Sequence, residues 1–81
     1  MEHTTTVLIA DSSEEFCGNL SAALQRFSGF QVVGTAADGE QAVRMITQLQ
    51  PKILVLDLML SKQDGLSVLK SISAMEQKPI T

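Results

Sequence analysis

The chain has 81 residues, which is enough for one domain, and its 44% hydrophobic content argues against disorder. Nine acidic and six basic residues give a net charge of -3, which predicts no nucleic-acid-binding surface. The single cysteine, Cys17, excludes an internal disulfide, and no apolar run is long enough for a signal peptide or a membrane span. These features predict a cytoplasmic protein.

The first quarter of the chain predicts a strand followed by a helix. Residues 6–11 form a β-branched, apolar run that is typical of a strand buried on both faces. Ser12 is then expected to cap a helix, with Glu15 completing a capping box. Cys17 is interpreted as a small packing residue, and Gly18 as either a weak point or a place of close packing. The residues expected to face inward are Phe16, Leu20, Ala23, Leu24 and Phe27.

The rest of the chain repeats this alternation. Strands are predicted over residues 30–36 and 52–57, and helices over residues 37–50 and 66–77. Asp38 is the expected cap of the second helix, Pro51 follows its end, and the turn signal Asp64-Gly65 precedes the third. Residues 78–81 would begin a fourth strand. The apolar faces of these two helices would comprise Ala42, Val43, Ile46 and Leu49, and Leu66, Leu69, Ile72 and Met75.

Strands that alternate with helices predict an α/β fold with a parallel sheet covered by helices. In such a sheet the carboxyl ends of the first and third strands meet at one edge, which brings Asp11 and Asp57 into one crevice. Two close carboxylates repel each other unless a cation joins them, and Mg2+ accepts such ligands. A carboxylate beside Mg2+ can attack phosphorus as a nucleophile. The alternative is that both are only capping or loop acids.

The sequence contains no motif that is typical of a nucleotide-binding protein, a zinc protein or a hydrolase. It has no glycine-rich phosphate loop, no His/Cys cluster and no nucleophile elbow. A small unrelated α/β enzyme or nucleotide-binding protein is therefore the weakest of the interpretations considered.

Three blocks of the chain resemble the receiver domain of two-component response regulators. They are residues 7–15 (VLIADSSEE), 32–43 (VVGTAADGEQAV) and 51–72 (PKILVLDLMLSKQDGLSVLKSI). The resemblance runs from about Thr5 to Ile80 and is closest to receivers of sporulation-regulator and LuxR-like transcription factors. It implies a flavodoxin-like (CheY-like) three-layer fold. Residues 1–81 would then be a partial receiver domain, comprising the first β-α-β-α-β-α half and a stub of strand four.

The resemblance also implies a function in two-component signalling. Receivers accept a phosphoryl group from a histidine kinase or phosphotransfer protein, here onto Asp57. Their Mg2+ would be bound by Asp11, Asp57 and the backbone carbonyl of Met59. Such a domain is not an enzyme beyond self-catalysed phosphotransfer and dephosphorylation. Its output, usually transcription, would lie outside this chain.

Three departures from the family pattern raise an alternative function. Ser12 stands where receivers usually have a second acid, so Mg2+ binding should be weaker and Ser12 would contribute only through a water molecule. Leu60-Ser61 replaces the usual Met-Pro, which removes a rigid backbone angle. The chain also stops where strand four starts, before the switch hydroxyl and the conserved lysine of receivers. The alternative is a non-phosphorylated pseudo-receiver that serves as a dimerisation or protein-interaction module.

An open sheet edge at this point predicts pairing with another chain, and a homodimer is expected. No contact with nucleic acid or membrane is expected for this fragment.

Overall fold

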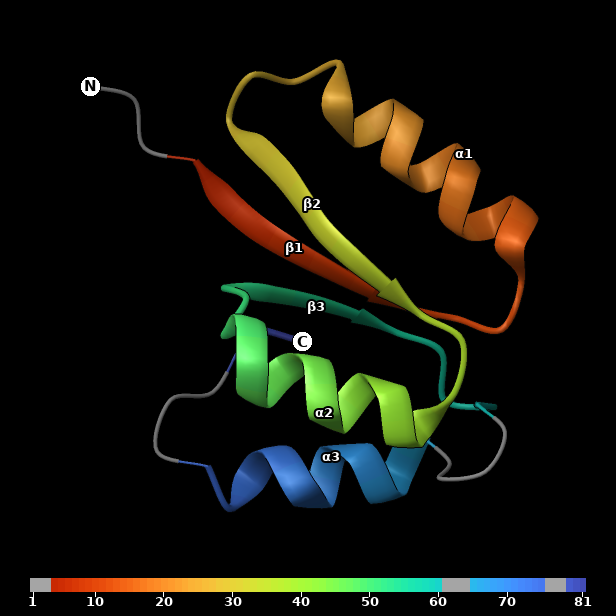
Figure 1. Ribbon diagram of the computed structural model, residues 1–81, viewed down its shortest axis with the longest axis vertical. Coiled ribbons are helices and arrows are strands. Elements are labelled where there is room, and N and C mark those ends of the chain that lie inside the picture. Colours follow the sequence, from red (N-terminus) through yellow and green to blue (C-terminus); the bar gives the residue numbers. More distant parts are fainter. Residues whose placement is uncertain (1–3, 61–64, 76–78) are drawn as a thin grey trace.

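The computed structural model describes residues 4–60, 65–75 and 79–81 and shows three strands alternating with three helices (Figure 1). The strands are β1 (Thr5–Ala10), β2 (Phe30–Ala36) and β3 (Ile53–Leu56), and the helices are α1 (Glu14–Gln25), α2 (Gly39–Leu49) and α3 (Gly65–Ser73). All strand pairs are parallel, and the strand order is β2-β1-β3. The predicted alternation and the parallel sheet are confirmed.

β1 occupies the centre of the sheet, between β2 and β3. Its residues Val7 to Ala10 are all buried. It pairs with β3 in regular register, but with β2 the register shifts: Val7 lies opposite Val32, and Leu8 lies opposite Gly34. Val33 is therefore an extra residue in β2, which makes a bulge.

The last described residues add a strand-like contact outside β3. The Leu54 N–H donates to the Ile80 carbonyl at 2.7 Å, and the Ile80 N–H donates to the Lys52 carbonyl at 2.8 Å. Ile80 forms a parallel bridge with Ile53. The expected stub of a fourth strand is thus present, and it lies beside β3.

Helices cover both faces of the sheet, as Figure 1 shows: α1 lies on one face, and α2 and α3 lie on the other. Each face has its own apolar cluster. The buried residues on the α1 face are Val7, Ile9 and Cys17. Those on the α2–α3 face are Leu8, Ala10, Ala36, Ala42, Ile46, Leu54, Leu60, Val68 and Ile72. The burial of Cys17 confirms its predicted packing role.

The cap of α1 differs from the prediction. The N-cap is Ser13, whose hydroxyl accepts from the Phe16 N–H at 3.1 Å, and Ser12 is exposed. The reason lies in the residue before the two serines. Asp11 Oδ1 accepts from the Ser13 N–H at 2.8 Å, which closes a local turn around Ser12 and moves the helix start one residue on. The predicted Asp38 cap of α2 is confirmed, since its side chain accepts from the Gln41 N–H at 2.9 Å.

The predicted helix faces were partly wrong. Five residues expected to face inward are exposed: Phe16, Ala23, Phe27, Leu49 and Leu66. Helix α1 contacts the sheet through a narrow stripe of Cys17, Leu20 and Leu24, and Phe27 follows the end of the helix. In α3 the stripe runs through Val68 and Ile72, and Val68 was missed. The third helix also ends at Ser73, four residues before its predicted end.

No helix in the described part of the chain is long and apolar enough to cross a membrane.

Candidate functional site

Two acids lie at the carboxyl ends of adjacent strands, as the sequence predicts. Asp11 follows β1 and Asp57 follows β3, and the register pairs the preceding residues, Ala10 and Leu56. The Asp57 N–H donates to the Ala10 carbonyl at 2.9 Å, which continues the ladder one step beyond the strand. The Asp11 N–H in turn donates to the Ala36 carbonyl at 3.0 Å. The backbone therefore brings Asp11 and Asp57 to the same edge of the sheet, which we call the carboxyl edge.

Both carboxylates are held by the backbone two residues further along. Asp11 Oδ1 accepts from the Ser13 N–H at 2.8 Å, and Asp57 Oδ1 accepts from the Met59 N–H at 2.9 Å. Each bond orients its carboxylate without a second side chain. Within the described part of the chain, the other oxygen of Asp57 has no hydrogen-bond partner and can bind a cation or attack an electrophile.

The loop after Asp57 presents its backbone to the carboxylate. Met59 donates its N–H to Asp57, while its side chain is 85% exposed. Leu60 is buried in the core beneath α2 and α3, which anchors the loop one residue later. Ser61, Lys62 and Asp64 lie outside the described residues.

The donor set at this edge fits a hard divalent cation. Mg2+ takes one or two carboxylates together with carbonyls and water, and Asp11 and Asp57 supply two carboxylates. Among the described residues no group of three or more His, Cys, Asp or Glu side chains is arranged for a metal, so any such ion would keep several waters. Ser12, which follows Asp11, is exposed.

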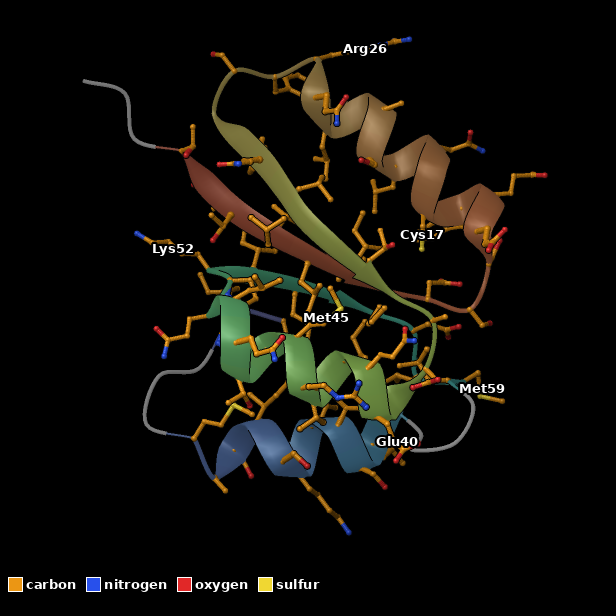
Figure 2. The ribbon with its side chains drawn as sticks, in the orientation of Figure 1. Cys17, Arg26, Glu40, Met45, Lys52 and Met59 are labelled. Carbon is orange, nitrogen blue, oxygen red and sulfur yellow. The ribbon has the colours of Figure 1, made fainter. Side chains whose placement is uncertain are left out.

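Charge is distributed unevenly between the two ends of the strands. Figure 2 shows Glu40 and Met59 at the carboxyl edge, whereas Lys52 lies at the opposite end, where β3 begins. The first turn of α1 adds two further acids, Glu14 and Glu15. Among the described residues, several acids therefore lie at the same end as the two candidate metal ligands.

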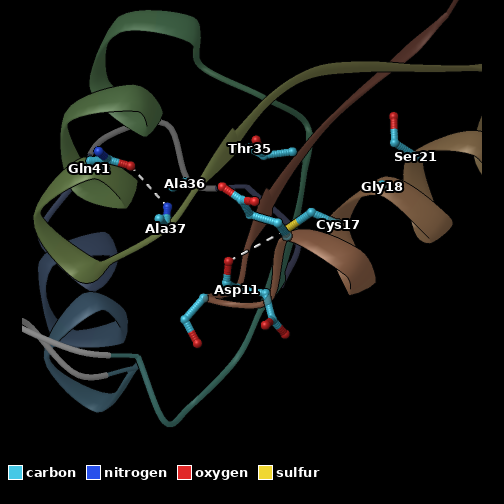
Figure 3. Close-up of a pocket in the computed structure, with 10 residues that line it drawn as sticks. Asp11, Cys17, Gly18, Ser21, Thr35, Ala36, Ala37 and Gln41 are labelled. Carbon is cyan, nitrogen blue, oxygen red and sulfur yellow. Dashed lines mark hydrogen bonds between the residues drawn. The ribbon is translucent and has the colours of Figure 1, made fainter.

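A groove of about 470 Å³ lies beside the carboxyl edge, between α1 and the ends of β1 and β2 (Figure 3). We call it the α1 groove. At its mouth the thiol of Cys17 donates to the Asp11 carbonyl at 3.5 Å. Burial, and then the nearby Asp11 carboxylate, raise the pKa of the Cys17 thiol, so it stays protonated at neutral pH. Cys17 is therefore a packing residue that braces the Asp11 turn.

The α2 side of the groove is fixed by a hydrogen bond that the sequence analysis missed. Gln41 Oε1 accepts from the Ala37 N–H at 2.9 Å (Figure 3), while the side chain of Asp38 accepts from the Gln41 N–H. Asp38 and Gln41 have the spacing of a capping box, and this spacing could have revealed the pair. The groove itself could not be predicted, because it depends on how α1 lies against β2.

A model of the response regulator receiver domain matches residues 7–81. The chain belongs to this family. The receiver domain is therefore that of a two-component response regulator, as the sequence resemblance implied. A CheB-type relative, protein-glutamate methylesterase/protein-glutamine glutaminase 6 of Anaeromyxobacter dehalogenans, is 36% identical over 77 residues, which cover 95% of this chain and 22% of the relative. The chain thus spans about a fifth of the length of this relative.

Solved receiver structures confirm the fold. The response regulator domain of Thermotoga maritima CheB superposes with a TM-score of 0.89 at 26% identity, covering 94% of this chain and 57% of that one. A Borrelia burgdorferi CheX-CheY-BeF3-Mg2+ complex gives a TM-score of 0.85 at 30% identity, covering 95% and 58%. The predicted CheY-like fold is confirmed, and the unrelated-enzyme and pseudo-receiver alternatives are not favoured. The roles of Asp11, Ser12, Asp57 and Met59 stay predictions.

Proposed function

We propose that this receiver accepts a phosphoryl group on Asp57 in a reaction that requires Mg2+. The observation that carries the proposal is the pairing of Asp11 and Asp57 at adjacent strand ends, each carboxylate oriented by a backbone N–H. Asp11, Asp57 and the Met59 carbonyl would bind the ion, and Ser12 would bond one of its waters. One of the structurally similar complexes contains BeF3 and Mg2+, and this supports the same chemistry here.

The chemical step needs only one group of this chain as nucleophile. An oxygen of the Asp57 carboxylate attacks phosphorus of a phosphohistidine, the phosphorus–nitrogen bond breaks, and the histidine nitrogen keeps the electron pair. The product is an acyl phosphate on Asp57 and a histidine ready to take up a proton. Mg2+, when bound, offsets the negative charge on the transferred phosphoryl oxygens. The chain's own contribution is positioning: the Met59 N–H holds Oδ1 of Asp57 and fixes the plane of the carboxylate.

The donor would be a sensor histidine kinase or a phosphotransfer protein in the cytoplasm. The chain would act as a phosphoacceptor rather than a true enzyme, with self-catalysed phosphotransfer and dephosphorylation as its only chemistry. The regulated output would be transcription, as in the LuxR-like receivers that the sequence resembles.

Intact mass spectrometry tests the phosphoacceptor proposal. The chain is incubated with acetyl phosphate and Mg2+, and a gain of one phosphoryl group is expected. Asp57→Asn should abolish the gain, because the amide is not a nucleophile, and should keep the circular dichroism spectrum. Glu40→Gln, which neutralises an exposed acid in the first turn of α2, is the matched control and should be phosphorylated normally. An unmodified wild-type chain, or a modified Asp57→Asn, would refute the assignment.

We also propose that the 81-residue chain forms a homodimer through the sheet edge beyond Ile80, the residue that bridges to β3. Ile80 is 73% exposed, and Ile53 and Val55 are only partly buried on the α1 face. An exposed edge with apolar neighbours favours pairing with a second strand. Light scattering coupled to size-exclusion chromatography is expected to give the mass of a dimer, and Ile80→Lys is expected to shift it toward the monomer. A wild-type monomer across micromolar concentrations would refute the dimer.

A further inference from the structure

One peptide unit connects the side chain of Gln41 to the backbone of Asp11. The peptide between Ala36 and Ala37 lies at the end of β2, and its carbonyl accepts from the Asp11 N–H at 3.0 Å. Its N–H donates to Gln41 Oε1 at 2.9 Å, as Figure 3 shows. Because a trans peptide is planar, its carbonyl and its N–H point in opposite directions. A rotation of this peptide plane would therefore weaken both hydrogen bonds together.

The bond to the Ala36 carbonyl holds Asp11 against a second strand. The Ser13 N–H orients the Asp11 carboxylate, but Ser13 is only two residues away and moves with Asp11. The Cys17 thiol contacts the Asp11 carbonyl at 3.5 Å, and a thiol is a weak donor. The bond from the Asp11 N–H to Ala36 is therefore the stronger of the two that hold the Asp11 backbone just beyond β1.

The separation of the two carboxylates depends on this contact. The Asp57 N–H donates to the Ala10 carbonyl at 2.9 Å, so Asp57 is held by the last residue of β1. Ala10 is paired with Ala36 in the sheet, and Asp11 is held by the Ala36 carbonyl. A change in the direction of that carbonyl would move Asp11 while Asp57 stays in place.

We propose that Gln41 is a positioning residue for the Mg2+ site. Its Oε1 holds the peptide between Ala36 and Ala37, and this peptide holds Asp11 where its carboxylate can share an ion with Asp57. The inference rests on the proposed function, and it adds to the site a residue that touches neither the ion nor the phosphoryl group. The competing interpretation is that Gln41 only completes the cap of α2. The two interpretations differ in what the loss of Gln41 does to Asp11.

The affinity for Mg2+ is the first readout. Gln41→Met keeps the length of the side chain and removes the acceptor, and Mg2+ titration followed by NMR is expected to give an affinity about two- to five-fold lower. The loss is modest because Ala37 and Gln41 are exposed, so water can replace part of the bond.

Thr6→Val is the matched control. It removes a side-chain oxygen that accepts from the Lys52 N–H at 3.0 Å, at the opposite end of the sheet, and it should bind Mg2+ as the wild type does. Equal losses in Gln41→Met and Thr6→Val, or no loss in Gln41→Met, would overturn the inference.

The second readout needs no Mg2+. In the 15N,13C-labelled chain, a scalar coupling through the hydrogen bond joins the Asp11 nitrogen to the Ala36 carbonyl carbon. This coupling should fall in Gln41→Met, stay unchanged in Thr6→Val and recover in Gln41→Glu, whose carboxylate again offers an acceptor oxygen. A residue that only caps α2 would change the free energy of unfolding and leave the coupling as it is. An unchanged coupling in Gln41→Met, or no recovery in Gln41→Glu, would overturn the inference.

This inference and the proposed function fail in different ways. A wild type that binds no Mg2+ would overturn both. A wild type that binds Mg2+ and is phosphorylated on Asp57, with Gln41→Met equal to it in affinity, would overturn the role of Gln41 alone.

Discussion

Replacing Gly34 by alanine tests how closely α2 is seated on β2. Gly34 follows the bulged residue Val33, and a Cβ atom at this position would lie 2.5 Å from Cε of Met45. The same atom would be 3.6 Å from Cδ1 of Leu8 and from Cδ1 of Leu49, which is ordinary contact. Carbon atoms prefer about 3.5–4.0 Å, so the clash with Met45 is about 1 Å deep and the Met45 side chain must move.

The magnitude follows from two opposing effects. Overpacking a well-packed core lowers the free energy of unfolding by about 1–3 kcal/mol, and because the clashing atom is the flexible end of Met45, this case lies in the lower part of the range, near about 1.5 kcal/mol. Gly34 has no positive φ, so alanine also restricts the unfolded chain and returns about 0.4–1 kcal/mol. The expected net loss in Gly34→Ala is about 0.5–1 kcal/mol, or about 2–8 °C in Tm for a domain of this size.

Urea denaturation followed by circular dichroism measures this loss, and two further variants test whether the contact with Met45 causes it. Gly18→Ala is the matched control, because its new methyl group meets nothing within 4 Å, and it should raise the free energy of unfolding by about 1 kcal/mol. In the background of Met45→Ala, the loss caused by Gly34→Ala should disappear. A Gly34→Ala variant as stable as the wild type, or an undiminished loss without Met45, would refute the reasoning.

Three further predictions concern the helix ends and the metal site. Gln50 ends α2 with φ 46°, so Gln50→Gly should raise the urea midpoint, with a gain of about 0.5 kcal/mol after the added freedom of the unfolded chain is counted. Ser13→Ala should lower the free energy of unfolding by about 1 kcal/mol in the same assay, and Ser12→Ala by much less; equal losses would contradict the observed cap. Ser12→Asp should tighten Mg2+ binding in a calorimetric titration, and an unchanged affinity would exclude Ser12 from the site.

The carboxyl edge could be predicted because it depends only on chain topology. Alternating strands and helices require a parallel sheet, and a parallel sheet brings Asp11 and Asp57 together whatever the details of packing. The helix faces could not be predicted as well. Helical periodicity predicts that Phe16 and Leu66 face inward. Only the placement of α1 and α3 against the sheet decides that Cys17 and Val68 are the residues that pack on it.

The cap of α1 shows a different limit. Ser12 and Ser13 have the same intrinsic capping preference, and Glu15 at the right distance favoured Ser12. In the structure Ser13 is the N-cap, and the Asp11 carboxylate accepts a hydrogen bond from the Ser13 N–H. This bond joins residues only two apart, so a local turn formed by Asp11 selected between two otherwise equivalent caps, and Asp11 is the sequence signal that could have indicated Ser13.

The same bond explains why the site can keep its shape although it lacks the usual second acid. Asp11 and Asp57 are oriented by the N–H groups of Ser13 and Met59, and not by the side chain at Ser12. An exchange of Ser12 for an acid is therefore expected to alter the charge beside the two proposed metal ligands without moving them. It follows that Ser12 should change Mg2+ affinity, whereas the direction of the Asp57 carboxylate, on which the proposed attack on phosphorus relies, depends on the loop backbone that the buried Leu60 holds in place.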